Sequence, residues 1–288
     1  MSISFDGRVA IVTGAGGGLG RCHALDLAAR GAKVIVNDLG GAMDGTGGSS
    51  AAAEAVVGEI KAAGGEAIAN GGSVSDPAGA QSMVDDAMKA WGRVDILINN
   101  AGILRDKTFT KVTIEDFQAV VDVHLMGAMM VTKAVWPIMK AQNFGRIVMT
   151  TSPSGLFGNF GQTNYGAAKL GLVGFMNTLK IEGAKNNIHT NAIAPVALTR
   201  MTENLIPEEA GKNLGPELIT PAVTFLCSDD APNGVVVQAA GGNFSVAAIV
   251  ENTGANLGPE AKAEDVAAAW SQITDLTGAK QRNMLQLG

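Results

Sequence analysis

Tyr165 and Lys169, four residues apart, are the two side chains of this sequence best suited to acid–base chemistry. An apolar-periodic run that continues to Lys180 predicts that both lie on a buried helix. Residues four apart share a helix face, so we expect the phenol and the ammonium side by side. A neighbouring cation should lower the phenol pKa from about 10, which would let Tyr165 take a proton from an alcohol. The alternative is an amphipathic tyrosine beside a solvated lysine, although Tyr165 is the only tyrosine in the chain.

A glycine-rich turn near the N-terminus has the features of a nucleotide-binding loop. The apolar run Arg8–Thr13 leads into the turn, and a helical pattern and a second apolar run, Lys33–Asp38, follow it. Gly14, Gly18 and Gly20 would let a pyrophosphate approach backbone N–H groups at the start of that helix. A turn with no ligand is the alternative.

Asp38 ends the second predicted strand, eighteen residues after Gly20. A carboxylate there can accept hydrogen bonds from an adenosine ribose and would repel a 2′-phosphate. Gly17 occupies a turn position where a basic residue would favour that phosphate. Both features favour NAD over NADP, and an aspartate that only caps a turn is the alternative.

The remaining patterns alternate between strand and helix. We predict strands at Glu66–Ala69, Val94–Ile98, Arg146–Ser152, Ile188–Ala194 (broken by Pro195) and Gly234–Ala239, and helices at Ala51–Ala63, Pro77–Trp91, Ile114–Gln142 and Glu217–Ser228. This order predicts an α/β fold: a single Rossmann-type domain, residues 1–250, whose doubly wound parallel sheet has about seven strands and helices on both faces. Residues 251–288 would form a helical extension with an amphipathic helix at Ala263–Asp275, packed on the same domain or on a neighbouring subunit.

Composition argues against several kinds of partner. A net charge of −6 and a pI near 5.1 disfavour nucleic acid. The two cysteines and three scattered histidines have no metal-ligand spacing, so we expect no metal. The most membrane-like run, Gly234–Val250, is too polar for a span, and the N-terminus has no signal-peptide pattern. We therefore expect a cytoplasmic protein with no membrane partner.

Four motifs in order give a resemblance to a known family. The segments Thr13–Gly20 and Asn99–Gly102, then Ser152, then Tyr165-x-x-x-Lys169, together resemble the short-chain dehydrogenase/reductase family. Within it, four longer segments resemble the (3R)-hydroxyacyl-CoA dehydrogenase part of peroxisomal multifunctional enzymes type 2: Val34–Gly41, Asn99–Asp106, Gly155–Lys169 and Asn187–Pro195.

The resemblance implies roles for single residues. Tyr165 would be the general acid or base, Ser152 would bind the substrate oxygen, and Lys169 would lower the pKa of Tyr165 and hold the nicotinamide ribose. Ser154 is an alternative to Ser152, which could instead cap the strand end. Cofactor contacts would come from the turn with Gly14, Gly18, Leu19 and Gly20, from Asp38, from Ser73 and Val74 at the adenine, from Asn99, Ala101 and Gly102, and from Pro195 and Thr199 at the carboxamide. Asn99 and Asn100 could equally be turn residues.

His124 departs from the family pattern. Many members have an asparagine in the middle of the corresponding long helix, where it anchors a water relay to the lysine, and here that position is His124. A neutral imidazole can also hold a water, so we include His124 among the catalytic residues. A buried histidine with a purely structural role is the alternative.

The implied activity is NAD-dependent oxidation of a secondary alcohol, with (3R)-3-hydroxyacyl-CoA converted to 3-ketoacyl-CoA. A 17β-hydroxysteroid or another bulky alcohol is an alternative substrate, and a protein that binds NAD without turnover is a third interpretation. Three cations, Arg105, Lys107 and Lys111, either meet the phosphates of coenzyme A or form a solvated face. Family habit implies a homodimer or a homotetramer.

Overall fold

The computed structural model describes residues 2–42, 44–198 and 213–281. It divides into two compact units, Met1–Val246 and Ala247–Gly288. The boundary predicted at residue 250 falls a few residues beyond this division. Whether the second unit packs on its own first unit or on a neighbouring subunit stays a prediction.

The first unit is built on one eight-stranded sheet with the order β3-β2-β1-β4-β5-β6-β7-β8. Neighbouring strands from β3 to β7 run parallel. The chain moves outward from β1 in one direction and then returns to build the other half from β4, so the carboxyl ends of β1 and β4 flank the crevice where ligands of such sheets bind. The strands are β1 Val9–Thr13, β2 Lys33–Asn37, β3 Glu66–Asn70, β4 Ile96–Asn99, β5 Gly145–Thr150, β6 Ile188–Val196, β7 Val236–Ala240 and β8 Asn243–Ala247.

The predicted fold class is confirmed, but the number of strands was one too low. Residues 243–247, for which we predicted no strand, form β8. Gly241 and Gly242 join β7 to β8 with φ values of 54° and 81°. Two positive φ values in a two-residue turn match the geometry that folds a chain into an antiparallel hairpin.

We expected Pro195 to break the strand Ile188–Ala194, but β6 continues through it. Its register partner is Ala239 of β7, and the strand continues to Val196. The carbonyl of Ile193 bonds the backbone of Thr151, on the β5 side. Pro195 is two residues after Ile193, so its backbone nitrogen faces the same side of β6. The neighbouring strand on that side, β5, ends at Thr150, so the missing N–H of Pro195 removes no hydrogen bond between strands.

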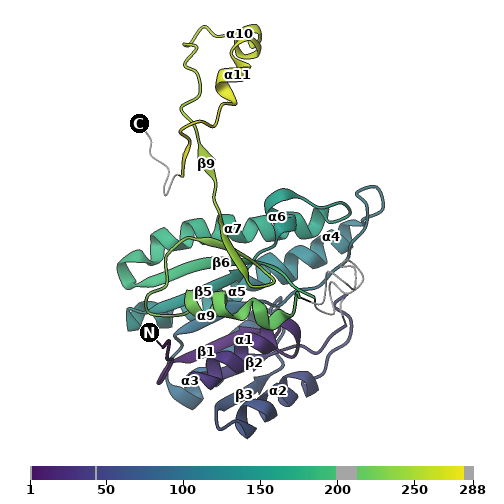
Figure 1. Ribbon diagram of the computed structural model, residues 1–288. Coiled ribbons are helices and arrows are strands. Elements are labelled where there is room, and N and C mark those ends of the chain that lie inside the picture. The colour runs from purple at the N-terminus through teal and green to yellow at the C-terminus, as the bar shows by residue number, and fades with distance from the viewer. Residues whose placement is uncertain (1, 43, 199–212, 282–288) are drawn as a thin grey trace. The chain divides into compact units, whose positions relative to one another are not determined.

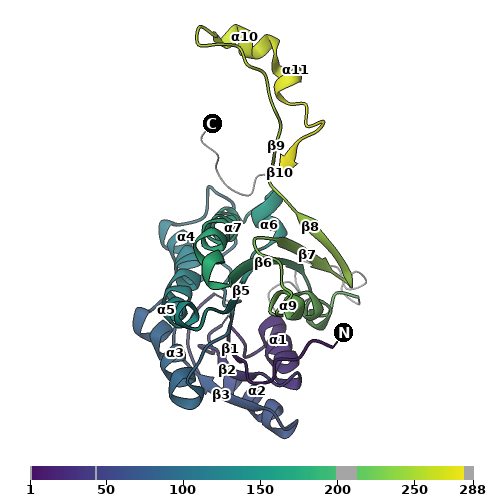
Figure 2. The same cartoon turned by 90° about the vertical axis from the view of Figure 1, so that its left-hand side faces the viewer.

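Helices cover both faces of the sheet. Figure 2 shows α3, α4, α5 and α7 on one side and α1, α2 and α9 on the other. The bounds are α1 Gly18–Ala29, α2 Ala51–Ala62, α3 Pro77–Trp91, α4 Ile114–Val121, α5 Gly127–Gln142, α6 Pro153–Phe157, α7 Thr163–Gly183 and α9 Thr220–Leu226, with short 3-10 turns at Ala184–Asn186 and Pro216–Leu218. The predicted helix Glu217–Ser228 is shorter in the structure, because a 3-10 turn precedes Pro221 in the first turn of α9.

The long predicted helix Ile114–Gln142 is present, with a π-helical turn, η1 Asp122–Met126, between α4 and α5. With a mean hydropathy of 1.3, it is the one helix among the described residues that is long and apolar enough to cross a membrane. Here it packs along α3, α7 and strands β4 and β5, so part of its apolar surface is buried in the core (Figure 1). Single π turns are frequent at functional sites, and this one contains His124.

The second unit contains little regular structure. The predicted helix Ala263–Asp275 is two short helices, α10 Ala263–Ala268 and α11 Trp270–Ile273, which Ala269 separates. Strands β9 Val250–Glu251 and β10 Lys280–Gln281 pair antiparallel. Trp270 and Leu276 of the predicted apolar stripe are both exposed, so this unit gains little from a core of its own.

Candidate active site

The glycine-rich turn connects β1 to α1 as predicted. Gly14 and Gly18 have positive φ values of 63° and 52°, which suit glycine, and Leu19 and Gly20 lie in the first turn of α1. A Cβ atom on Gly20 would lie 2.4 Å from the Gly14 carbonyl oxygen, so no side chain fits there. No side chain caps the start of α1 among the described residues. Its first N–H groups are therefore available to an anion.

Asn100 and Thr13 hold this turn against the end of β4, which sequence reasoning missed. The Asn100 side chain donates to the carbonyl oxygens of Thr13 and Gly14, at 3.0 Å each. The Thr13 hydroxyl accepts from the backbone N–H groups of Asn100 and Ala101, at 3.0 and 3.1 Å. The signal was the pair of polar residues at two adjacent strand ends, of which Asn100 was left as a possible turn residue.

Asp38 lies directly after β2 and faces the turn. Its Oδ2 accepts from the backbone N–H of Gly16 at 2.8 Å, and its Oδ1 accepts from the N–H of Gly40 at 2.6 Å. The carboxylate therefore fixes the glycine turn. Each carboxylate oxygen has two lone pairs, so both can still accept a second hydrogen bond, such as one from a ribose hydroxyl.

Ser152, Tyr165 and Lys169 come together from two elements. Ser152 caps the N-terminus of α6, where its hydroxyl accepts from the Ser154 N–H at 3.1 Å. The same hydroxyl acts on the Tyr165 phenol as a hydrogen-bonding group that lowers its pKa, and Ser154 has no such effect. The Lys169 ammonium lies 5.4 Å from the centre of the Tyr165 ring and donates to the Thr150 carbonyl at 2.6 Å.

The pKa of Tyr165 is shifted in the direction opposite to our prediction. Burial raises it to about 12, the Asp106 charge adds to the rise, and the hydrogen bond with Ser152 only partly offsets them. Burial also lowers the pKa of Lys169 to about 7. The prediction considered the charge of Lys169 but not the burial of the two groups. In the protein without cofactor, desolvation changes the two pKa values more than their mutual interaction does.

His124 lies on the π turn and closes one side of the pocket. Its Nε2 lies 2.8 Å from the carbonyl oxygen and 3.1 Å from the backbone nitrogen of Ile103. Its buried Nδ1 has no hydrogen-bond partner among the described residues. Burial, and secondarily the Lys169 charge, lowers the pKa of His124 well below its usual value, so the ring is neutral.

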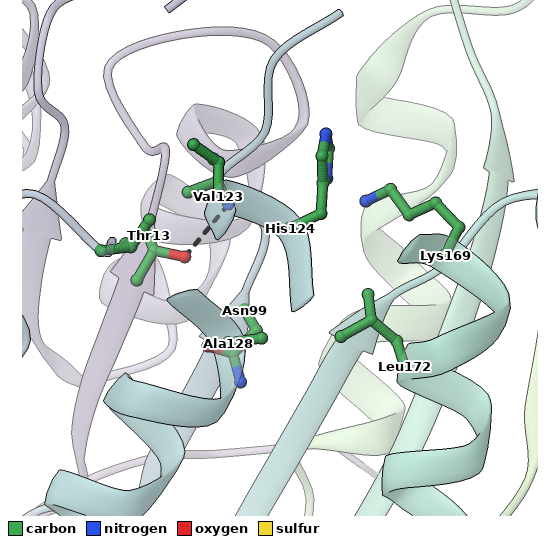
Figure 3. Close-up of a pocket in the computed structure, with 9 residues that line it drawn as sticks. Thr13, Asn99, Val123, His124, Ala128, Lys169 and Leu172 are labelled. Atoms are coloured by element: carbon green, nitrogen blue, oxygen red, sulfur yellow. Dashed lines mark hydrogen bonds between the residues drawn. The ribbon is translucent and has the colours of Figure 1, made fainter. Parts of the chain in front are cut away.

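Figure 3 shows the pocket that His124 and Lys169 line, with the Lys169 amino group pointing toward His124. Asn99 lies at its floor and donates to the Thr132 hydroxyl at 3.0 Å, while its buried Oδ1 has no partner in the described part of the chain. The lining also includes Thr13, Val74, Ala101, Val123, Ala128 and Leu172.

The other predicted contact residues lie at the same edge of the sheet, with one exception. Ser73 and Val74 follow β3, and Asp76 caps α3 by accepting from the Gly79 N–H at 3.0 Å. Gly102 lies against His124, where a Cβ atom would come within 2.2 Å of the imidazole Cε1. Pro195 is near the end of β6. Thr199 lies outside the described residues.

These residues fit a nicotinamide dinucleotide. Uncapped N–H groups at the start of α1 suit a pyrophosphate, the Asp38 carboxylate suits a ribose, and the unpartnered Asn99 Oδ1 and His124 Nδ1 lie in the pocket between them and Tyr165. No group of three or more metal-ligating side chains is found in the described ranges.

Comparison with known proteins agrees with this geometry. A family model for the short chain dehydrogenases matches residues 8–210. The chain belongs to the short-chain dehydrogenase family. A short-chain type dehydrogenase/reductase of Mycobacterium tuberculosis is 54% identical over 274 residues, which are 95% of this chain and 96% of that protein.

Two further relatives of this short-chain dehydrogenase are informative. Peroxisomal multifunctional enzyme type 2 of Drosophila melanogaster is 50% identical over 96% of this chain, and its solved structure superposes with a TM-score of 0.82. This chain spans 47% of that enzyme's length, so the activity of the whole enzyme does not transfer directly. A 7α-hydroxysteroid dehydrogenase, solved with NADH and 7-oxo glycochenodeoxycholic acid, has a TM-score of 0.75 at 31% identity and covers 83% of this chain and 95% of its own.

Proposed function

We propose that this protein oxidises (3R)-3-hydroxyacyl-CoA to 3-ketoacyl-CoA with NAD. The observation that carries the proposal is the convergence of Ser152, Tyr165 and Lys169 near the carboxyl edge of the sheet. Ser152 lowers the pKa of Tyr165 as a hydrogen-bonding group, and the Lys169 ammonium lies 5.4 Å from the centre of the Tyr165 ring. Support for the substrate comes from the identity to multifunctional enzymes type 2, whose fungal counterparts are named hydratase-dehydrogenase-epimerases.

The two hydroxyl groups divide the chemistry of the substrate oxygen. When bound, NAD would accept the hydride from the carbinol carbon. As the carbon is oxidised, the carbinol oxygen must lose a proton, and Tyr165 would take it while Ser152 holds that oxygen in place. In the reverse direction Tyr165 would return the proton and Ser152 would stabilise the developing negative charge. With a pKa of about 12 the phenol of the free protein is protonated, which is the form needed for ketone reduction.

NAD rather than NADP is proposed on the position of Asp38. Its carboxylate is fixed at the end of β2 by two backbone N–H groups. A 2′-phosphate in this position would meet a like charge that cannot rotate away.

The test is the initial rate of NADH formation with (3R)- and (3S)-3-hydroxybutyryl-CoA, each with NAD and with NADP. We expect turnover of the (3R) substrate with NAD. A preference for the (3S) substrate would contradict the proposed stereochemistry, and a preference for NADP would contradict the proposed role of Asp38.

A hydroxysteroid is the second candidate substrate, favoured by the similarity to the 7α-hydroxysteroid dehydrogenase. Rates with a 17β-hydroxysteroid and with the acyl-CoA, measured side by side, distinguish the two. NAD binding without turnover of any secondary alcohol would instead favour the third interpretation, a cofactor-binding protein. The homodimer or homotetramer and the cytoplasmic location also stay predictions.

A further inference from the structure

The carboxylate of Asp106 is flanked by two cations in sequence but paired with neither. Arg105 and Lys107 both form ion pairs with Asp116, at 3.4 and 2.6 Å. Arg105 also donates through Nε to the backbone carbonyl of Asp44 at 3.0 Å. Asp106 has no ion pair in the described part of the chain, so its negative charge is not compensated by a neighbouring side chain.

Gln162 fixes that charge next to the start of α7. Its side-chain nitrogen donates to Asp106 Oδ2 at 2.6 Å, and its own oxygen accepts from Asn159 at 3.0 Å. Gln162 is buried, which restricts the rotation of both side chains. The Gln162 hydrogen bond therefore orients Asp106 although Asp106 is exposed.

The loop that carries Asp106 is attached to the helix that carries Tyr165. The Asn164 side chain donates to the Arg105 carbonyl at 3.0 Å and accepts from the Tyr165 N–H at 2.8 Å. The Lys107 N–H donates to the Gly161 carbonyl at 2.9 Å. The Asp106 charge reaches the phenol, since it contributes to the raised pKa of Tyr165.

We propose that Asp106 determines specificity by excluding substrates that have an ionised carboxylate next to the reacting carbinol. This inference rests on the proposed function. A free 3-hydroxy acid whose carbinol oxygen meets Tyr165 would bring its carboxylate into the field of Asp106, where like charges repel. A thioester of the same acid is uncharged at that carbonyl. Asp106 therefore restricts the enzyme to acyl derivatives without a charge at the carboxyl carbon, and Gln162 is the positioning residue that orients the Asp106 carboxylate.

The test compares kcat/KM for (3R)-3-hydroxybutyrate and for its coenzyme A thioester in the wild-type protein and in Asp106→Asn. Asparagine keeps an oxygen that accepts the Gln162 hydrogen bond, so only the charge is removed. We expect Asp106→Asn to raise kcat/KM for the free acid about tenfold and to change that for the thioester much less. Glu115→Gln is the matched control, because Glu115 is an exposed carboxylate near this loop that does not contribute to the Tyr165 pKa.

A second readout separates the charge from the packing. Removing the charge should move the pH midpoint of kcat/KM for the thioester to lower pH, because Lys169, His124 and Ser152 remain as the groups that face the phenol. Asp106→Ser also removes the charge and replaces Asp106→Asn in the test if that variant folds poorly. We expect it to change the ratio of kcat/KM for the free acid to that for the thioester in the same direction.

The outcomes distinguish the two proposals. Turnover of the thioester by the wild-type protein, with the same discrimination in Asp106→Asn and Asp106→Ser, would overturn the role of Asp106 and leave the proposed function standing. Absence of turnover with the thioester in the wild-type protein would overturn both.

Discussion

The imidazole of His124 meets the ring of Tyr165 edge-on, with ring centroids 5.2 Å apart and ring planes at 88°. Edge-to-face contact is a favoured arrangement for aromatic rings. The Ile103 backbone holds the far side of the imidazole through Nε2. His124 is therefore a fixed packing neighbour of Tyr165, the residue that would exchange the proton.

Replacing His124 by leucine should lower kcat while the NAD dissociation constant changes little. Leucine has neither the ring edge nor the Ile103 hydrogen bond, so Tyr165 loses a fixed neighbour, and a small displacement of a catalytic group can cost about a hundredfold. Steady-state rates and NAD titration calorimetry would measure this. The matched control is His189→Leu, since His189 lies at the amino end of β6 and should leave kcat unchanged. Unchanged kcat in His124→Leu would show that the contact is only structural.

Tyr165→Phe should abolish turnover and leave NAD affinity nearly intact. Phenylalanine keeps the ring contact with His124 but lacks the hydroxyl that exchanges the proton, and general acid–base catalysis is typically worth about 10² to 10⁴ in rate. NADH absorbance and NAD calorimetry give both quantities. Turnover close to the wild-type rate would rule out Tyr165 as the acid or base.

Asp38→Ala should weaken NAD binding and reduce the rejection of NADP. The structure adds a second consequence, because the Gly16 N–H loses its acceptor and the glycine turn becomes less fixed. Asp38→Asn separates the two effects, since an amide oxygen can still accept from Gly16 but the charge is gone. The measurement is the ratio of kcat/KM with NAD to that with NADP. An unchanged ratio in both variants would place the ribose contact elsewhere.

Stability should decrease as the pH falls from about 6.5 toward 4, in part through His23. Burial lowers the pKa of His23 to about 4, while its Nδ1 shares a hydrogen bond with the Thr220 hydroxyl at 2.9 Å. The unfolded chain then binds more protons than the folded one between these pH values, so stability is lost as pH falls through this window. The shift corresponds to about 3 kcal/mol.

Urea unfolding of the wild-type protein and of His23→Gln at several pH values would test this prediction. Glutamine does not titrate, so the free energy of unfolding should vary less with pH in the variant. Part of the slope should persist, because burial also lowers the pKa values of His124 and His189. His189→Gln is the control, with a smaller expected change since that ring is only half-buried. Equal slopes in the wild type and His23→Gln would contradict the prediction.

The sequence alone was sufficient for the alternating strands and helices, the glycine turn and the order of the motifs. These features are local: a strand or helix pattern, a turn that needs glycine, and an aspartate at a strand end are written in consecutive residues. For that reason the bounds of α3, and the placement of Tyr165 and Lys169 on one helix, were predicted closely. The strand of the main sheet that was missed, β8, follows a glycine pair and has mostly exposed residues, so its pattern resembles that of a loop.

Only the tertiary structure decided the electrostatics of the site and the contacts between distant segments. The direction of the Tyr165 pKa shift depends on burial under elements far away in sequence, which outweighs a charge one helical turn away. Three other features depend on contacts between segments that are distant in sequence. Asn100 donates to the Gly14 carbonyl, Arg105 and Lys107 pair with Asp116 rather than with Asp106, and Pro195 is accommodated in β6. Sequence spacing determines which groups share an element, whereas desolvation and pairing depend on how separate elements pack.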